Sequence, residues 1–166
     1  MEAIYKRRSI RRYTGDPVDR EQLLELISAG MSAPSAGNEQ PWHFIVIDDR
    51  GLLDRIPDVH PHSQMIKQAP VAILVCGDLT LEKHPGFWVQ DCAAATENIL
   101  IAVASRGLGS VWLGVYPREE RVAGMRKLLG LPDHIVPFSL LPVGYPAEKK
   151  GPRDDFDISR VRYNGW

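Results

Sequence analysis

The chain has 166 residues, of which 44% are hydrophobic and 25% charged, with a formal net charge of −1. This composition is typical of one ordinary globular domain, and the balanced charge argues against a nucleic-acid partner. Cys76 and Cys92 lie in apolar segments, which predicts buried thiols in a reducing compartment. We see no signal peptide and no apolar run long enough to span a membrane, so we expect a cytoplasmic protein without a membrane partner.

The first half of the chain alternates helical and extended patterns. Asp19 followed by Gln22 resembles a capping box, from which a helix is expected to run to about Gly30. The segment at residues 71–77 is apolar on both faces, which indicates a buried central strand. Around these two elements we predict short helical segments at residues 1–5, 51–56 and 65–68, a strand at residues 43–48, and irregular structure at residues 35–41 and 57–62.

The second half contains the longest predicted helix, at residues 89–106. Gly107 is expected to end it as a left-handed C-cap. A strand at residues 110–114, a helix at residues 119–129 ended by Gly130, and a strand at residues 135–144 follow. Pro137 and Pro142 lie inside the last strand, and because proline cannot donate a ladder hydrogen bond they predict an edge strand or a bulge.

The C-terminal segment changes composition after Tyr145. A polar stretch comes first, and a short extended piece is predicted at residues 161–166. The later residues are too apolar for a solvated tail: Phe156, Ile158, Val161, Tyr163 and Trp166. We therefore expect the segment to dock, either on its own domain or on a partner.

Four arginines and one serine lie within six residues near the N-terminus, at Arg7, Arg8, Ser9, Arg11 and Arg12. In an extended conformation Arg7, Ser9 and Arg11 point to the same side. A guanidinium group offers a fixed fork of donors that matches phosphate oxygens, and a serine hydroxyl adds one more donor. The stretch favours a phosphate site, and a solvated basic face is the alternative interpretation.

Several other sites find little support in the sequence. No glycine-rich dinucleotide or ATP loop is present. His60 and His62 lie near Asp58 but lack a third firm ligand, so no metal site is predicted. Two interpretations of these histidines remain open, as ordinary surface residues or as residues that border a pocket.

Two stretches together resemble a known family: RRSIRRY at residues 7–13 and SAGNEQPWHF at residues 35–44. The later order agrees, with KQAP at residues 67–70, QDCAAATEN at residues 90–98 and GLGSVWLG at residues 107–114. Over essentially its whole length the chain resembles the FMN-dependent nitroreductase family, as a compact member. The resemblance implies an α+β fold with a mixed sheet flanked by helices, built as an intertwined homodimer. Residues 1–166 would form one FMN-binding domain, with 147–166 as a C-terminal arm that embraces the partner subunit.

The resemblance also implies a set of FMN-binding residues. Those expected to bind the phosphate, the ribityl chain and the pyrimidine edge are Arg7, Arg8, Ser9 and Arg11, with Lys150 and Arg153 completing the phosphate clamp. Those expected to approach the flavin from the partner chain are Pro34, Ser35, Ala36, Asn38 and Gln40, and backbone groups of Leu113 and Gly114 would line the ring. The alternatives are that Asn38 and Gln40 cap a turn, that Gly114 ends a strand, and that Arg153 is a solvated charge.

In such a protein the flavin carries the redox chemistry while the protein supplies position and electrostatics. The resemblance implies that NADH or NADPH reduces FMN, which then reduces an electrophilic small molecule such as a nitroaromatic or a quinone. No catalytic protein residue is assigned. The alternatives are a flavin-binding or sensing protein with little turnover, or a family member that performs dehalogenation, ene reduction or flavin consumption.

Overall fold

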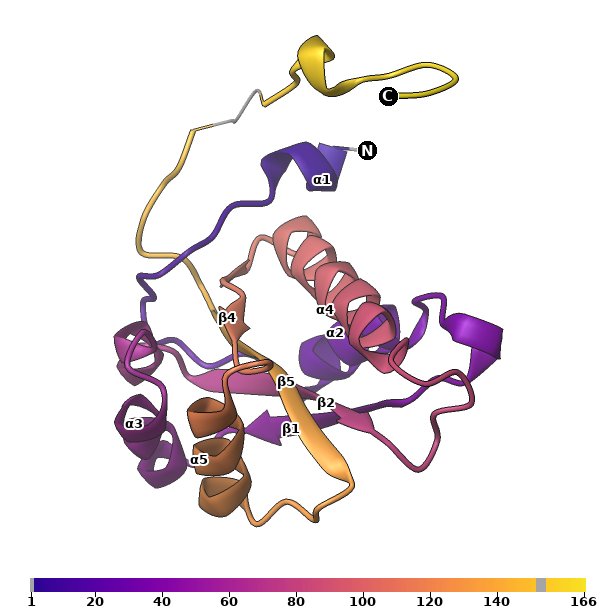
Figure 1. Cartoon of the computed structure of the whole chain (residues 1–166). Coiled ribbons are helices and arrows are strands. Elements are labelled where there is room, and N and C mark those ends of the chain that lie inside the picture. The colour runs from indigo at the N-terminus through magenta and orange to yellow at the C-terminus, as the bar shows by residue number, and fades with distance from the viewer. Residues whose placement is uncertain (1, 152–154) are drawn as a thin grey trace.

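A five-stranded sheet with helices on both faces forms the body of the protein (Figure 1). The computed structural model describes residues 2–151 and 155–166. The helices are α1 (Glu2–Lys6), α2 (Arg20–Met31), α3 (Arg50–Val59), α4 (Trp88–Ser105) and α5 (Glu119–Leu129), with short 3-10 turns η1 (Ala36–Asn38), η2 (Gln64–Lys67) and η3 (Ile158–Arg160). The strands are β1 (Trp42–Ile47), β2 (Val71–Asp78), β3 (Gly109–Ser110), β4 (Leu113–Gly114) and β5 (Ile135–Gly144). The predicted α+β class is confirmed.

The strands follow the order β1-β2-β5-β3, and β4 also pairs with β5. All of these strand pairs are antiparallel. Parallel pairing enters through an isolated bridge between Ser9 and Ser110, which attaches the arginine-rich stretch to the end of the sheet. Within the described residues, this bridge is therefore the only parallel pairing in the mixed sheet that the family resemblance implies.

Side chains on alternate positions of β2 pack against different helices. Val71, Ile73 and Val75 share a core with α2 and α4. The intervening residues Ala72, Leu74 and Cys76 share a second core with α3 and α5. Figure 1 shows these two helix pairs on opposite faces of the sheet. Burial on both faces explains why the sequence of this strand is continuously apolar.

The two prolines of β5 lie in the middle of the sheet, so the predicted edge position is wrong and the predicted bulge is confirmed. The register with β2 shifts between Val75, which lies opposite Ser139, and Cys76, which lies opposite Pro137. Pro142 lies between the part of β5 that pairs with β3 and the part that pairs with β4. The predicted strand at residues 110–114 is accordingly split into two short strands.

The helix ends follow local chemistry, with one exception. Gly107 and Gly130 have φ angles of 72° and 65°, as expected for left-handed C-caps. The capping box at the start of α2 is wrong, because the Asp19 side chain makes no capping hydrogen bond. Asp49 instead caps α3 by accepting from the Leu52 N–H at 2.8 Å. That helix continues through Pro57 to Val59, into a segment predicted to be irregular.

The two ends of the described chain lie side by side beyond the sheet and α4 (Figure 1). The Ala147 N–H donates to Arg12 O at 2.8 Å, and Tyr13 forms a bridge with Pro146. Residues 155–166 form no strand, so the extended piece predicted at residues 161–166 is not part of a sheet. Tyr163 is 81% exposed and the Trp166 side chain is fully exposed.

Candidate functional site

The arginine-rich stretch is fixed in place by its apolar residues. The Ile10 N–H donates to Ser110 O at 2.8 Å, and the buried Tyr13 hydroxyl donates to Ile10 O at 2.7 Å. A Cβ at Gly109 would lie 2.7 Å from Ile10 Cγ2, so glycine is required for this close approach. Ile10 and Tyr13 are both buried. The backbone of the stretch is therefore an ordered part of the fold, and its basic side chains project from fixed positions.

Arg8 uses most of its guanidinium donors on backbone carbonyls. Nε donates to Gly151 O at 2.8 Å, and Nη1 donates to Tyr5 O at 2.8 Å and to Arg7 O at 2.5 Å. Nη2 is buried and has no acceptor among the described residues. A buried donor without a partner costs about 1–3 kcal/mol. An anion that supplied an acceptor oxygen at this point would remove that cost.

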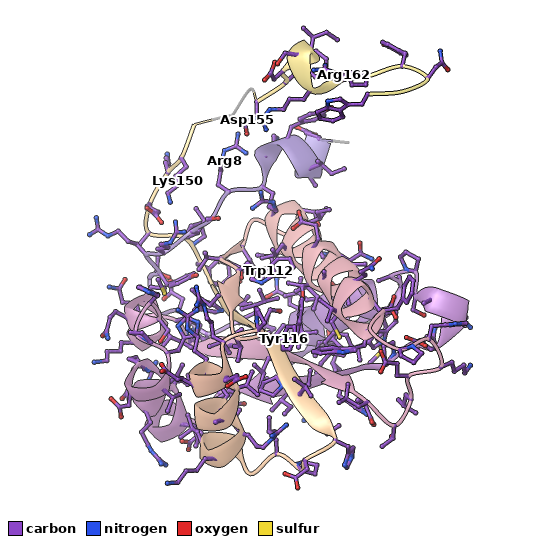
Figure 2. The ribbon with its side chains drawn as sticks, viewed as in Figure 1. Arg8, Trp112, Tyr116, Lys150, Asp155 and Arg162 are labelled. Carbon is purple, nitrogen blue, oxygen red and sulfur yellow. The ribbon has the colours of Figure 1, made fainter. Side chains whose placement is uncertain are left out.

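A cavity of 810 Å³ lies between the N-terminal and C-terminal segments. Its size is within the range of small-molecule sites. The lining residues are Ile4, Tyr5, Arg7, Arg8, Ser9, Arg11, Lys150, Asp155 and Phe156. Figure 2 shows Arg8 of the N-terminal segment beside Lys150 and Asp155 of the C-terminal segment. Basic side chains outnumber acidic ones in this lining, so the cavity favours an anionic ligand.

Acidic residues beside the cavity hold its basic residues in position. Arg7 Nε lies 3.2 Å from a carboxylate oxygen of Glu97 in α4. Lys150 donates to Ser9 O and lies 3.6 Å from Glu148. The Arg11 N–H donates to the Glu148 carboxylate, and this hydrogen bond holds the pKa of Glu148 below its usual range. The cations thus approach the cavity with part of their hydrogen bonding already fixed.

Five of the predicted FMN-binding residues therefore meet at one cavity: Arg7, Arg8, Ser9, Arg11 and Lys150. Arg153 lies outside the described residues. A cluster of cations with one buried, unsatisfied guanidinium N–H fits the phosphate end of FMN. None of the other predicted residues lines this cavity.

The segment at residues 34–40, which overlaps the loop predicted at residues 35–41, forms a tight turn beside the first turn of α4. Gly37, Asn38 and Gln40 have φ angles of 52°, 54° and 49°. Such angles are uncommon for residues other than glycine, and glutamine tolerates them less well than asparagine does. The Gln40 N–H donates to Ser35 Oγ and the Ala36 N–H to Asp91 Oδ1, both at 3.0 Å. Pro34, Asn38 and Gln40 are exposed on this turn.

The Gly114 carbonyl accepts two side-chain hydrogen bonds, from His60 Nε2 at 3.0 Å and from Arg121 Nη1 at 2.8 Å. His60 is 1% exposed, and burial lowers its pKa, so its neutral ring donates through Nε2. The Val115 N–H donates to Phe138 O. Because hydrogen-bonded positions alternate along an antiparallel strand, the backbone N–H and C=O groups of Gly114 point away from β5. His60 thus lies next to a predicted flavin-binding residue, although it is buried inside the protein, whereas His62 is exposed.

Aromatic side chains on both sides of β4 keep it against the sheet. Trp112 packs edge-to-face on Phe138 with ring centroids 5.8 Å apart, and Tyr116 packs on Trp88 at 4.8 Å. Figure 2 labels Trp112 and Tyr116 at the two ends of this segment. The Leu113 side chain is buried in the core, which leaves only its backbone for a ligand.

Sequence reasoning left open whether His60 borders a pocket, and it missed three further polar residues that the structure places beside the predicted site. His60 and Arg121 converge on Gly114, and Glu39 and Asp91 are buried beside the turn at residues 34–40. Each of these residue types is common on surfaces, and nothing in the local sequence marks them as buried. Within residues 2–151 and 155–166, no cluster of three His, Cys, Asp or Glu side chains is arranged to hold a metal ion. No helix within the same residues is long and apolar enough to cross a membrane.

The chain is similar to known proteins along almost its whole length. A family model described as "Nitroreductase family" matches residues 4–145. A relative from Methanothermobacter thermautotrophicus, provisionally named as an NADH dehydrogenase/NAD(P)H nitroreductase, is 54% identical over all of this chain and 87% of its own length. A crystal structure from Parabacteroides distasonis with the same provisional name has a TM-score of 0.95 at 43% identity, covering 99% of this chain and 97% of that one. An FMN-dependent nitroreductase from Clostridium difficile has a TM-score of 0.92 at 28% identity, and both chains are covered completely. This chain belongs to the nitroreductase family.

Proposed function

We propose that this chain is an FMN-dependent oxidoreductase that takes electrons from NADH or NADPH and reduces an electrophilic small molecule, such as a nitroaromatic or a quinone. The family membership supports the reaction class, and relatives carry the names NAD(P)H nitroreductase and FMN-dependent nitroreductase. The single observation that carries the proposal is the cationic cavity with the buried, unpaired Nη2 of Arg8. When bound, FMN supplies the electron transfer.

The protein's own residues bind and orient the cofactor. Arg8, with Arg7, Arg11 and Lys150 around it, would hold the phosphate, whose charge of nearly −2 requires several cations. Asn38 and Gln40 would contact the flavin from a second copy of the chain. Gly114 would lie at the ring, with its peptide fixed by Arg121 and His60. No protein acid or nucleophile is needed for this scheme.

We further propose that the protein acts as an intertwined homodimer. Two observations support this assembly. The turn at residues 34–40 does not line the cationic cavity, so one chain supplies only part of the predicted site. The C-terminal segment exposes several large apolar side chains, including Ile158 at 64% and Tyr163 at 81%. A second copy would cover these side chains and complete the site. A cytoplasmic location is also proposed, since both cysteines are free, buried thiols, as suits a reducing compartment.

Flavin titration followed by turnover tests the proposal. The purified protein should bind FMN, and the complex should oxidise NADH or NADPH when a quinone or a nitroaromatic is present. Rapid mixing with each nicotinamide separates an enzyme from a binding protein, because a binding protein would not be reduced quickly. A protein that binds neither FMN nor riboflavin would overturn the proposed function.

A further inference from the structure

Two carboxyl groups are buried together beside the turn at residues 34–40. Glu39 is 6% exposed and Asp91, in the first turn of α4, is 4% exposed. Acidic residues are seldom buried this deeply unless partners compensate the lost hydration. Among the described residues no cationic side chain forms a salt bridge with either carboxyl group, so the compensation comes from hydrogen bonds.

One oxygen of each carboxyl group is satisfied by backbone donors. Glu39 Oε2 accepts from the N–H groups of Lys83 at 2.6 Å and His84 at 3.0 Å. Asp91 Oδ1 accepts from the Ala36 N–H at 3.0 Å. These bonds join three segments, namely the turn, the loop before α4 and the first turn of α4. The carboxyl pair is the point at which they meet.

The second oxygen of each group, Glu39 Oε1 and Asp91 Oδ2, is buried and has no donor if both groups are ionised. The two side chains lie close enough to share a hydrogen bond, and such a bond requires one proton, because an ionised carboxylate is only an acceptor. A single proton on Asp91 that donates to Glu39 gives both oxygens a partner. Two ionised groups would instead repel each other at short range.

The surroundings decide where this proton resides. Burial, together with the neighbouring Glu39, raises the pKa of Asp91 against the effect of the Ala36 N–H. Burial also tends to raise the pKa of Glu39, but the hydrogen bonds from the N–H groups of Lys83 and His84 outweigh this effect, so the pKa of Glu39 is lowered. The other charged groups that face the pair are His84, which favours ionised Glu39, and Glu82, which disfavours ionised Asp91. Between the two pKa values the pair holds one proton, on Asp91.

The conformation of the turn is strained, so it must be stabilised by interactions with its surroundings. Asn38 and Gln40 hold positive φ angles, and a Cβ at Gly37 would lie 2.4 Å from His84 Nε2. Backbone conformations of this kind persist only where the surrounding structure fixes them. Glu39 lies between Asn38 and Gln40. Of residues 37–40, Glu39 is buried and the other three are exposed.

We propose that Glu39 and Asp91 are positioning residues, whose shared proton locks the turn at residues 34–40 in the conformation that binds FMN. The inference rests on the proposed function, since it takes this turn as part of the flavin site. As pH rises through the raised pKa of Asp91, the proton is lost and the two carboxylates repel. The fraction of molecules with a competent turn then falls, and FMN binds more weakly in proportion.

Asp91→Asn tests the shared proton directly. The Asn side chain keeps an acceptor for the Ala36 N–H and supplies a permanent N–H donor for Glu39. FMN affinity is measured for wild type and Asp91→Asn across the pH range in which both proteins stay folded, and the phosphate of FMN also titrates in part of this range. The ratio of the two dissociation constants cancels that contribution. We expect similar affinities at low pH and a wild type that weakens relative to the variant by at most about tenfold per pH unit at high pH. A ratio that does not change with pH would overturn the proposal.

His84→Gln removes the neighbouring titratable side chain and should leave this pH dependence in place. A second comparison uses isosteres of both acids. Asp91→Asn and Glu39→Gln should each be tolerated, because each supplies the donor that the proton supplies in the wild type. The double variant turns two amide groups toward each other, and it should lose more affinity than the two single changes combined. Additive losses would contradict a proton shared between the two side chains.

An infrared measurement on the flavin-free protein does not depend on FMN binding. The wild type should show the carbonyl band of a buried protonated carboxyl group at low pH, and the band should disappear as pH rises. Asp91→Asn should lack this band at every pH above the pKa of Glu39. If the protein bound no flavin, the proposed function would fail while this band still tested the carboxyl pair. A wild type without the band would overturn the shared proton, whatever the flavin affinity.

Discussion

Arg8 Nε donates to Gly151 O at 2.8 Å and so joins two residues that are 143 positions apart in the chain. The same guanidinium group also bonds the carbonyls of Tyr5 and Arg7. Arg8 lines the cavity and carries the buried, unpaired N–H, and its guanidinium group is therefore held by both the N-terminal and the C-terminal segment. Binding of an anion at Arg8 should be coupled to the order of the C-terminal segment.

Arg8→Lys should weaken FMN selectively. Lysine keeps the charge but lacks the fork that bonds three carbonyls and leaves one N–H for the ligand. A hydrogen bond to a charged group is worth about 1.5–3 kcal/mol, which corresponds to about 10- to 150-fold in affinity. Fluorescence titration with FMN should show this loss, and titration with riboflavin, which lacks the phosphate, should not. Arg12→Lys is the matched control, since Arg12 is exposed and does not line the cavity.

Arg153→Ala tests the C-terminal member of the predicted clamp, which lies outside the described residues. If Arg153 bonds the phosphate, the same arithmetic gives a loss of about 10- to 150-fold in FMN affinity. Lys150→Ala should cost less, because Lys150 already donates to Ser9 O and lacks a fixed fork. Equal losses of FMN and riboflavin in Arg153→Ala would remove this residue from the clamp.

Arg121→Met should affect the flavin ring end of the site. The change removes one of the two donors that fix the Gly114 carbonyl while keeping a side chain of similar length. We expect FMN and riboflavin to weaken alike, by about tenfold, together with a shift in the visible absorption of the bound flavin. Arg121→Lys should restore part of the affinity. Arg118→Met, in the exposed residue before α5, should have no such effect. A loss confined to FMN would place Arg121 at the phosphate instead.

Removal of residues 155–166 should destabilise the assembly. Obligate interfaces bury about 2,000–5,000 Å², and such dimers often have no stable folded monomer. Light scattering of the complete chain should give the mass of a dimer over a wide range of concentration. The shortened chain should show a mixture of smaller or aggregated species and lose FMN. A folded monomer that keeps FMN would contradict the proposed homodimer.

Much of this fold could be predicted from the sequence where one pattern has one physical cause. The continuous apolar run of β2 reflects burial on both faces, and Gly107 and Gly130 end their helices as left-handed residues. The prolines of β5 left two possibilities open, and only the pairing with β2 separates a bulge from an edge. Asp19 matched a capping pattern, yet its side chain makes no capping bond, because the pattern does not fix the rotamer.

The candidate site was only partly accessible to the same reasoning. The arginine-rich stretch forms a cationic cavity because its charges are close in sequence. The hydrogen bond between Ala36 and Asp91 spans 55 positions, and the one between His60 and Gly114 spans 54. Pairs so distant along the chain depend on how the helices pack on the sheet. Without that packing, Glu39 and Asp91 look like ordinary surface acids.

The bridge between Ser9 and Ser110 also has a consequence for cofactor size. Ser110 fixes the arginine-rich stretch, and Gly114, four residues later, faces the open edge of β4. At about 3.3 Å per residue, the Cα atoms of these two residues can lie no more than about 13 Å apart. The span between the phosphate end and the ring end is thus limited by covalent chain length. One residue inserted between Ser110 and Gly114 would change the distance between the two ends of the site, and with it the length of ligand that fits.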